Sequence, residues 1–274
     1  MSAASEPGPG ADGDGDGAVI ALRGATLGYG GVPIVHGASF EVRAGEAIAL
    51  VGPNGSGKST IVRALAGLVD VLGGDVRVLG EPVAHLSDRW RVGYVPQASS
   101  IGDVGLTVRE LVSTGRLPRM SPWRPMGRTD RQAVADAIAL VDLAGQDGRR
   151  IGQLSGGQLR RALIARSLAA EPEILLLDEP TAGVDAATRA SLADSLRSLH
   201  DAGTTIVLVS HEIGPVEELV DRVVALREGR IDYDGPPRPG DRMGDGTHHH
   251  DHDHHPEAIA PVGGGLASGP MGGR

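Results

Sequence analysis

Short apolar runs alternate with stretches of helical periodicity over most of the chain. Continuous apolar runs such as residues 174–177 are typical of strands that are buried on both faces of a parallel sheet. We expect strands at residues 19–23, 40–42, 48–51, 75–79, 92–95, 174–177 and 205–209, and a terminal hairpin of strands 223–226 and 231–233. Because strands alternate with helices, the pattern predicts an α/β fold with a mainly parallel central sheet.

Helical periodicity dominates from about residue 98 to about residue 170, which predicts a helical insertion between the halves of the sheet. Capping boxes at residues 107–110 and 129–132 predict the starts of two helices. The first helix is expected to end near Gly115 and the second near Leu143, with a loop at residues 117–127 between them. Further helices are expected at residues 61–68, at about 156–169, at about 186–199 and at 215–219.

Composition narrows the class of protein. The ends of the chain, residues 1–17 and 236–274, are rich in Gly, Pro and Asp, so we expect disordered tails around a folded domain at 18–235. A net charge of −9 argues against a general nucleic-acid binder. The absence of cysteine excludes disulfides and thiolate metal sites. No apolar stretch approaches the ~18 residues of a membrane span, and no signal pattern opens the chain, so we expect a cytosolic protein unless a partner holds it at a membrane.

The segment that follows the strand at 48–51 fits the phosphate-binding pattern G-x-x-x-x-G-K-[ST]. Its residues are Gly52, Pro53, Asn54, Gly55, Ser56, Gly57, Lys58, Ser59 and Thr60. Glycines turn backbone N–H groups onto phosphate oxygens, and the following helix adds positive potential at its N-terminus. We expect Lys58 to reach the β- and γ-phosphates and Ser59 to ligate Mg²⁺. A glycine-rich turn with a chance lysine is the alternative, but Lys58 is the only lysine in the chain.

A second glycine-rich segment, Leu154-Ser-Gly-Gly-Gln158, opens the third helix of the insertion. Most such stretches are only loops. As chemistry, this segment is a second anion site made of a hydroxyl, glycine N–H groups and a helix N-terminus. One chain does not need two such sites for one γ-phosphate, whereas two chains arranged head to tail would.

Polar side chains follow the ends of several predicted strands. Asp178 and Glu179 end the run 174–177, where ligands bind in parallel sheets, although a solvated turn before Pro180 is the ordinary alternative. An Asp that holds Mg²⁺ beside a Glu that activates water is what phosphoanhydride hydrolysis requires. Gln97 and His211 each follow a strand and would share this edge with Lys58; alone, each is an ordinary polar residue. Tyr29 could stack on adenine or be a plain turn tyrosine.

Taken in order, these segments make residues 19–235 resemble the ATP-binding subunit of an ABC transporter. The resemblance implies the P-loop ABC ATPase fold, with a mainly parallel central sheet, an antiparallel β subdomain and an inserted helical subdomain. It implies ATP hydrolysis with Mg²⁺, a head-to-tail dimer of two ATPase subunits, and integral-membrane permease subunits that hold the ATPase peripherally at the cytoplasmic face of the membrane.

The same resemblance implies roles for individual residues. Tyr29 would stack on adenine, and Gln97 would contact Mg²⁺ and sense the membrane partner. Asp185 would lie in a loop across the dimer contact, and His211 would contact the γ-phosphate. The ATP held by the opposite subunit would be bound by Ser155, Gly156, Gly157 and Gln158.

A finer resemblance concerns the cargo. Residues 95–101, 119–131 and 178–185 resemble the zinc/manganese uptake ATPases, which implies metal-ion import and, indirectly, a metal-binding solute receptor. That group usually has an aromatic residue and a proline just before the Thr-Val at 107–108, whereas this chain has Gly102-Asp-Val-Gly-Leu106. An iron chelate or haem therefore stays an alternative cargo.

Two other classes of protein fit the sequence less well. A soluble ABC protein that acts on nucleic acid or ribosomes usually has two cassettes, a coiled coil or a basic surface, and this chain has one cassette and an acidic balance. A non-hydrolysing regulatory module should lack a catalytic group. Here the groups are present as Lys58, Asp178, Glu179 and His211.

The C-terminal tail contains a histidine cluster within residues 247–255, made of His248, His249, His250, His252, His254 and His255. Aspartates interrupt the cluster, and imidazole with carboxylate suits Zn²⁺, Ni²⁺ or Cu²⁺ better than Mg²⁺. The alternatives are a solvated low-complexity tail or a zinc buffer or sensor beside a metal pore.

Overall fold

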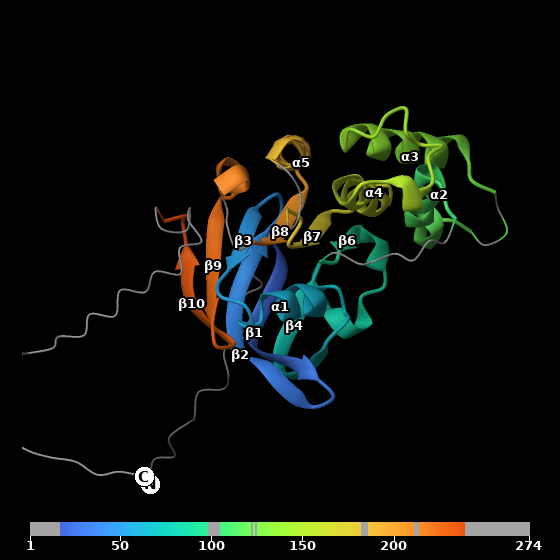
Figure 1. The fold of residues 1–274 in the computed structure, drawn as a ribbon. Coiled ribbons are helices and arrows are strands. Elements are labelled where there is room, and N and C mark those ends of the chain that lie inside the picture. Colours follow the sequence, from blue (N-terminus) through green and yellow to red (C-terminus); the bar gives the residue numbers. More distant parts are fainter. Residues whose placement is uncertain are drawn as a thin grey trace, which may run out of the picture. The chain divides into compact units, whose positions relative to one another are not determined.

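The structure is a computed structural model that describes residues 17–97, 105–121, 123, 125–181, 186–210 and 214–238. The strands in these residues form a four-stranded sheet in the order β2-β1-β4-β5 and a six-stranded sheet in the order β10-β9-β3-β8-β7-β6 (Figure 1). Nowhere in these ranges does a helix combine the length and the apolar character that crossing a bilayer requires.

The six-stranded sheet confirms the α/β prediction. Its parallel strands are β9 (Arg222–Arg227), β3 (Ala47–Val51), β8 (Thr205–Val209), β7 (Ile174–Asp178) and β6 (Val92–Val95), and β10 (Arg230–Gly235) pairs antiparallel with β9. Every residue of β7 and β8 is buried, as the continuous apolar runs predict. Because the five strands are parallel, the segments that follow β3, β6, β7 and β8 leave the sheet at one edge.

The four-stranded sheet is antiparallel and larger than the sequence pattern indicates. Its strands are β1 (Ala18–Tyr29), β2 (Val32–Arg43), β4 (Asp70–Val78) and the short β5 (Glu81–Pro82). The predicted strands at 19–23 and 40–42 were too short, because register shifts interrupt the alternation of β1 with both neighbours. At one such irregularity Gly74 approaches Gly24 so closely that a Cβ on Gly74 would lie 2.3 Å from the Gly24 carbonyl oxygen.

The helical insertion contains α2 (Val108–Ser113), η3 (Thr114–Arg119), α3 (Arg128–Leu140), η4 (Ile151–Gln153) and α4 (Gly156–Leu168). The capping box at Thr107 is confirmed, since the Thr107 side chain accepts from the Glu110 N–H and the Thr107 N–H donates to the Glu110 carboxylate. The box predicted at Thr129 was wrong. Gly127 caps α3 instead, and its N–H donates to the Asp130 carboxylate at 3.0 Å.

Two further α-helices and several short 3₁₀ turns surround the sheets. The helix α1 (Lys58–Leu65) follows β3, and α5 (Ala186–Asp201) precedes β8. Residues 114–119, where a helix end and a loop were expected, form the 3₁₀ helix η3. Further 3₁₀ turns are η1 (Val83–His85), η2 (Arg89–Arg91) and η5 (Gly214–Leu219).

Two apolar clusters flank the central strands. In β3, Ala47 and Ala49 belong to the cluster that includes α2, α3, α4 and α5, whereas Ile48 and Leu50 belong to the cluster that includes α1 and the antiparallel sheet. Residues of β7 and β8 alternate in the same way. The two-residue period of a strand therefore places helices over one face of the large sheet and α1 with the small sheet over the other.

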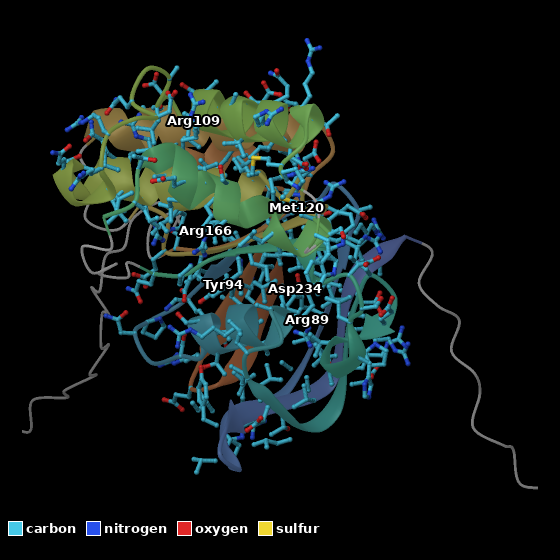
Figure 2. All side chains as sticks on the ribbon, turned by 90° about the vertical axis from the view of Figure 1, so that its right-hand side faces the viewer. Arg89, Tyr94, Arg109, Met120, Arg166 and Asp234 are labelled. Atoms are coloured by element: carbon cyan, nitrogen blue, oxygen red, sulfur yellow. The ribbon has the colours of Figure 1, made fainter. Side chains whose placement is uncertain are left out.

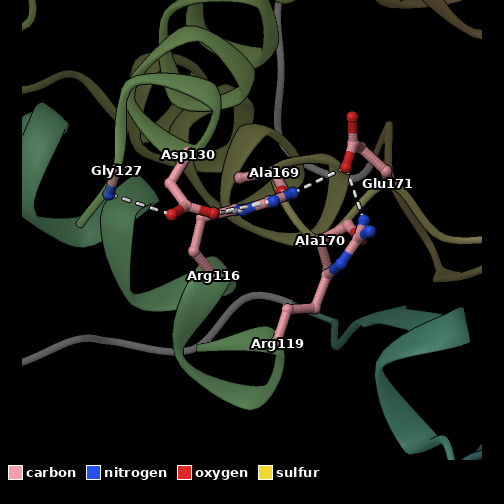
Figure 3. Close-up of polar contacts among 7 residues, drawn as sticks. All are labelled: Arg116, Arg119, Gly127, Asp130, Ala169, Ala170 and Glu171. Carbon is pink, nitrogen blue, oxygen red and sulfur yellow. Dashed lines mark hydrogen bonds and ion pairs between the residues drawn. The ribbon is translucent and has the colours of Figure 1, made fainter. Parts of the chain in front are cut away.

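An arginine-centred network fastens the insertion to the rest of the fold (Figure 3). Arg116 of η3 is only 6% exposed; it donates to the Asp130 carboxylate at 2.8 Å, to the Glu171 carboxylate at 2.7 Å and to the Ala169 carbonyl at 2.9 Å. Arg119 also contacts Glu171, and its guanidinium lies 4.3 Å from the centre of the Trp90 ring. The network joins η3, the start of α3, the segment after α4 and η2.

A cleft of about 290 Å³ lies where the insertion meets β6. Arg89 of η2, Tyr94 of β6 and Arg166 of α4 line it, and Figure 2 labels all three side chains. Tyr94 therefore lies between this cleft and Arg63 of α1, which donates a hydrogen bond to the Tyr94 hydroxyl.

Candidate nucleotide site

The loop between β3 and α1 has a backbone that requires glycine at two positions. Gly52 has φ +137°, and a Cβ there would lie 2.2 Å from the Leu226 carbonyl oxygen. Gly57 has φ +101° and caps α1, and a Cβ there would lie 2.8 Å from a Val35 methyl group. Side chains at either position would clash with neighbouring strands, so the loop can curl over the N-terminus of α1 only with these glycines.

Lys58 is the first residue of α1 and is 4% exposed. Its ammonium donates to the carbonyl oxygens of Gly52 at 2.8 Å and of Pro53 at 2.9 Å. Burial lowers the pKa of Lys58, while the nearby carboxylates of Glu179 and Asp178 act in the opposite direction. The side chain therefore places a buried point charge across the mouth of the loop, within the field of two carboxylates.

Asp178 and Ser59 form an oxygen-rich group at the end of β7. The Ser59 hydroxyl donates to Asp178 Oδ1 at 2.7 Å. Asp178 is fully buried, and within the described residues its other oxygen, Oδ2, has no hydrogen-bond partner, the closest charge being Arg63 at 3.7 Å. An unsatisfied buried carboxylate oxygen beside a hydroxyl suits a hard cation that prefers oxygen ligands.

These residues fit Mg²⁺ bound together with nucleotide phosphates. Magnesium is usually held by one or two carboxylates plus phosphate oxygens and water, so a full cage of protein carboxylates is not needed. Among the residues that the structure describes, no group of three or more His, Cys, Asp or Glu side chains suited to a metal occurs.

Glu179 and Gln97 meet directly after β7 and β6. The Gln97 side-chain amide donates to Glu179 Oε2 at 2.5 Å. Glu179 has φ +49°, a left-handed conformation that is uncommon for a residue other than glycine, and its N–H donates to the Val209 carbonyl of β8 at 3.1 Å. Strained residues of this kind often occur at active sites. The arrangement aims a carboxylate and an amide at the same space beside Asp178.

A cavity of about 460 Å³ joins these groups. Nine residues expected from the sequence line it, whereas Gly52, Pro53, Ser56 and Asp178 do not. The nine are Tyr29, Asn54, Gly55, Gly57, Lys58, Ser59, Thr60, Gln97 and Glu179. Tyr29 is 41% exposed at the end of β1, so its ring is accessible for stacking. A cavity with phosphate-binding loop, oxygen ligands, a carboxylate and an accessible ring can hold a nucleoside triphosphate and activate water against it.

Two arginines beside these groups were not predicted. Arg63 lines the cavity, lies four residues after Ser59 on the same face of α1, and donates to the hydroxyls of Tyr29 and Tyr94, both at 3.4 Å. These bonds raise the pKa of Arg63. Arg160 of α4 reaches the ends of β6 and β7. The spacing from Ser59 could have indicated Arg63; no sequence signal indicated Arg160.

The Leu154–Gln158 segment lies apart from this cavity. Ser155 caps α4, accepting from the Gln158 N–H at 3.2 Å, and the Gln158 side chain accepts from the Ser155 N–H at 3.0 Å. Ser155 and Gly156 are exposed, and a Cβ on Gly156 would have no neighbour within 4 Å. None of Ser155, Gly156, Gly157 and Gln158 is among the residues that line the cavity. The segment is accessible to another molecule.

Some predicted residues lie outside the described part of the chain. Asp185 and His211 do so, although α5 begins directly after the first and β8 ends shortly before the second. The histidines of the tail, at positions 248, 249, 250, 252, 254 and 255, also lie outside it.

Comparison with protein families gives one match, in which a model described as ABC transporter covers residues 35–182. The hemin import ATP-binding protein HmuV of Streptomyces coelicolor is 41% identical over 222 residues, which cover 79% of this chain and 78% of that protein. The manganese transport system ATP-binding protein MntB of Listeria monocytogenes is 35% identical over 216 residues, which cover 78% of this chain and 89% of that protein.

Other similar proteins are named for different cargoes. A sulfate/thiosulfate import ATP-binding protein of Caulobacter vibrioides is 39% identical, with coverage of 80% of this chain and 65% of that protein. Among solved structures, the dimeric bacterial ABC transporter cassette MJ0796 superposes with a TM-score of 0.70 and 27% identity, over 80% of this chain and 99% of that cassette.

Proposed function

This chain belongs to the ABC transporter family of ATP-binding subunits, and from that premise we propose that it drives the import of a divalent metal ion, zinc or manganese. Family membership makes it an ATPase whose hydrolysis of ATP is coupled to transport. The roles of individual residues, the cargo and the direction of transport belong to the proposal.

In the proposed nucleotide site, residues that line the 460 Å³ cavity act together with neighbours that do not line it, among them Asp178. Backbone N–H groups of residues 52–60 cradle the phosphates, and Lys58 moves its donors from loop carbonyls to phosphate oxygens, which are stronger acceptors. Tyr29 stacks on the adenine ring. Ser59, Asp178 and Gln97 would hold Mg²⁺, which would neutralise charge that develops on the phosphates.

Glu179 is the proposed general base. It lies beside Gln97 and close enough to Asp178 for both carboxylates to act on Lys58. In this role the Glu179 carboxylate accepts a proton from the attacking water, while Lys58 holds the γ-phosphate and Gln97 orients the carboxylate. His211 is proposed to contact the γ-phosphate from the segment that follows β8.

The second half of each ATP site is proposed to come from another copy of the chain. The observation that supports this is the exposure of Ser155 and Gly156 away from the chain's own cavity. In a head-to-tail dimer, the residues Ser155, Gly156, Gly157 and Gln158 would contact the γ-phosphate held by the partner, with Asp185 in a loop across the contact. Permease subunits would hold the dimer peripherally at the cytoplasmic face of the membrane, and a solute receptor would deliver the cargo.

Two observations support the choice of a divalent metal. The chain contains the histidine cluster at residues 247–255, and one of its relatives is a manganese transport ATP-binding protein. Imidazole and carboxylate groups bind Zn²⁺ well, which suits a buffer or sensor next to a metal pore. Haem is the second candidate, because the HmuV relative is 41% identical. A soluble ABC ATPase without a permease is the third.

Metal content of cells tests the cargo. Cells that lack this chain are complemented with the wild-type chain or with Lys58→Met, and cellular zinc, manganese and iron are measured by mass spectrometry in medium with limiting metal. We expect wild type to restore zinc or manganese and Lys58→Met to restore neither. Restoration of iron from supplied haem, with zinc and manganese unchanged, would favour haem import and reject the metal-ion proposal.

A further inference from the structure

Arg160 connects three segments that carry the proposed chemistry. It lies on α4, four residues after Gly156 and therefore on the same face of that helix. Its guanidinium donates to the Pro96 carbonyl, to the Asp178 carbonyl at 2.6 Å and to the Glu179 carbonyl at 2.9 Å. One side chain of the helix that begins with the exposed Ser155 thus holds the backbone before Gln97 and the backbone of both catalytic carboxylates.

The Arg160 guanidinium is buried, and hydrogen bonds to backbone carbonyls are its main compensation. Arg160 is 5% exposed, and no salt bridge to a carboxylate is present for it in the described ranges; its partners are carbonyl oxygens. Burial lowers the pKa of Arg160, with the charges of Asp178 and Glu179 acting against that change. A buried cation is costly unless hydrogen bonds satisfy it, and a purely apolar contact would cost less. The three carbonyls satisfy the two terminal nitrogens of Arg160, whereas its Nε has no hydrogen-bond partner within the described residues.

The Glu179 backbone is held from two sides. Its N–H donates to Val209 of β8, and its carbonyl accepts from Arg160 of α4. Between these bonds the residue keeps φ +49°, a conformation that persists only where the surroundings impose it. Without the Arg160 bond, the backbone of Glu179 would lose the hydrogen bond that holds its carbonyl group.

We propose that Arg160 is a positioning residue, which sets the Gln97–Glu179 pair for hydrolysis and links it to the Ser155 end of α4. This rests on the proposed function, in which the Ser155 end contacts the ATP of the partner subunit. Each subunit has its own hydrolytic site and, through its Ser155 end, completes the site of its partner. Arg160 then links these two sites. Contact with the partner's ATP, made at one end of α4, is transmitted to the backbone of Glu179.

The test compares Arg160→Met with Arg161→Met in the full chain assembled with its permease subunits. Arg161 is the matched control, because it is on the same helix but donates to Val141 and Asp142 of the insertion, away from the sheet edge. Steady-state ATPase rates give kcat, and fluorescent-ATP titration gives Kd. Since a small misplacement of a catalytic group can cost up to about 100-fold, we expect kcat of Arg160→Met to fall roughly 10-fold to 100-fold with Kd within about twofold of wild type.

Arg160→Lys is the second variant and covers the case in which the methionine variant does not fold. The ammonium keeps the charge but cannot span three carbonyls as the guanidinium fork does, so its kcat should lie between those of the methionine variant and wild type. Wild-type kcat in both Arg160 variants would overturn the proposal. So would an equal loss of kcat in Arg161→Met, or a rise in Kd that accounts for the lost activity.

The link between the two sites is tested in mixed dimers in which one subunit carries Glu179→Gln. In such a dimer, only the site that contains the partner's unchanged Glu179 hydrolyses ATP. Adding Arg160→Met to that same subunit should lower the remaining activity about threefold or more, since α4 of that subunit completes the active site. Unchanged activity would overturn the link. If Glu179→Gln homodimers hydrolyse ATP normally, the proposed role of Glu179 fails instead, and the two failures are distinguished.

Discussion

Replacing Lys58 with methionine should separate nucleotide binding from folding. The change removes an ammonium that donates to two loop carbonyls and is 4% exposed, and it keeps an unbranched chain of similar length. The loss of two hydrogen bonds to carbonyls is offset by relief of a buried charge, so we expect the melting temperature without nucleotide to change little.

With nucleotide, the same change removes charge-assisted hydrogen bonds to phosphate, which are worth about 1.5–3 kcal/mol. At ~1.4 kcal/mol per decade, Kd for Mg-ATP should rise roughly 10-fold to 150-fold. Ligand stabilisation follows RT ln(1 + [L]/Kd), so the stabilisation by saturating Mg-ATP should fall by the same energy. At roughly 2–4 °C per kcal/mol for a chain of this size, the thermal shift should shrink by about 3–12 °C.

The assay is thermal unfolding of wild type, Lys58→Met and Lys58→Arg with and without Mg-ATP. Lys58→Arg keeps the charge, but the planar fork does not fit the space of the ammonium, so it should also lose part of the shift. Because Lys58 is the only lysine, an amine-selective acylating reagent should modify it and the N-terminus, and Mg-ATP should protect it. An undiminished shift in Lys58→Met, or labelling that nucleotide leaves unchanged, would refute the placement of Lys58 on phosphate.

Three further predictions concern the metal, the insertion and the tail. Asp178→Asn should weaken Mg²⁺ binding about 10-fold or more in calorimetry while metal-free ATP still binds; equal Mg²⁺ affinity would remove Asp178 from the metal site. Arg116→Met should lower unfolding free energy by about 1–3 kcal/mol at neutral pH. Hydrogen bonds from Arg116 hold the pKa values of Asp130 and Glu171 below their usual range, so this contribution is present above about pH 4 and is lost as pH falls through the lowered values; a deficit in denaturant unfolding that is the same at pH 7 and pH 3 would contradict it. In the full chain, zinc binding measured by calorimetry should weaken as pH falls through about 6.5. Deleting residues 241–274 should abolish this binding and leave basal ATPase activity intact. An unchanged zinc stoichiometry after the deletion would place the site elsewhere.

The features that the sequence predicted well are those determined locally. The glycine-rich loop between β3 and α1, the buried runs of β7 and β8 and the capping box of α2 depend on neighbouring residues, and each lies where it was expected. The wrong prediction at the start of α3 has the same local origin. Residues 129–132 have the spacing of a capping box, but Asp130 lies three residues after Gly127 and accepts from the Gly127 N–H instead. Spacing alone does not choose between these two helix starts.

Features set by distant segments were not predictable. The length of β1 and β2 depends on irregular pairing with neighbours, which interrupts the two-residue period. Arg160 donates hydrogen bonds to backbone carbonyl groups, which are brought into reach when β6 and β7 fold against α4. Every residue has a backbone carbonyl, so the sequence does not indicate which ones Arg160 contacts. The separation of Ser155 from the chain's own cavity likewise needed the structure, although the presence of two anion sites had already indicated two chains.

The most direct test of ATP held between two copies of this chain is the mass of Glu179→Gln in solution, measured by light scattering in excess Mg-ATP. Slowed hydrolysis should trap nucleotide at the contact, so we predict a species of twice the 28.1 kDa chain mass with Mg-ATP and the single-chain mass without it. Adding Ser155→Arg, which places a bulky charge at the exposed start of α4, should restore the single-chain mass. A Glu179→Gln chain that binds Mg-ATP yet stays at 28.1 kDa, or a dimer that the Ser155 change leaves intact, would contradict the account.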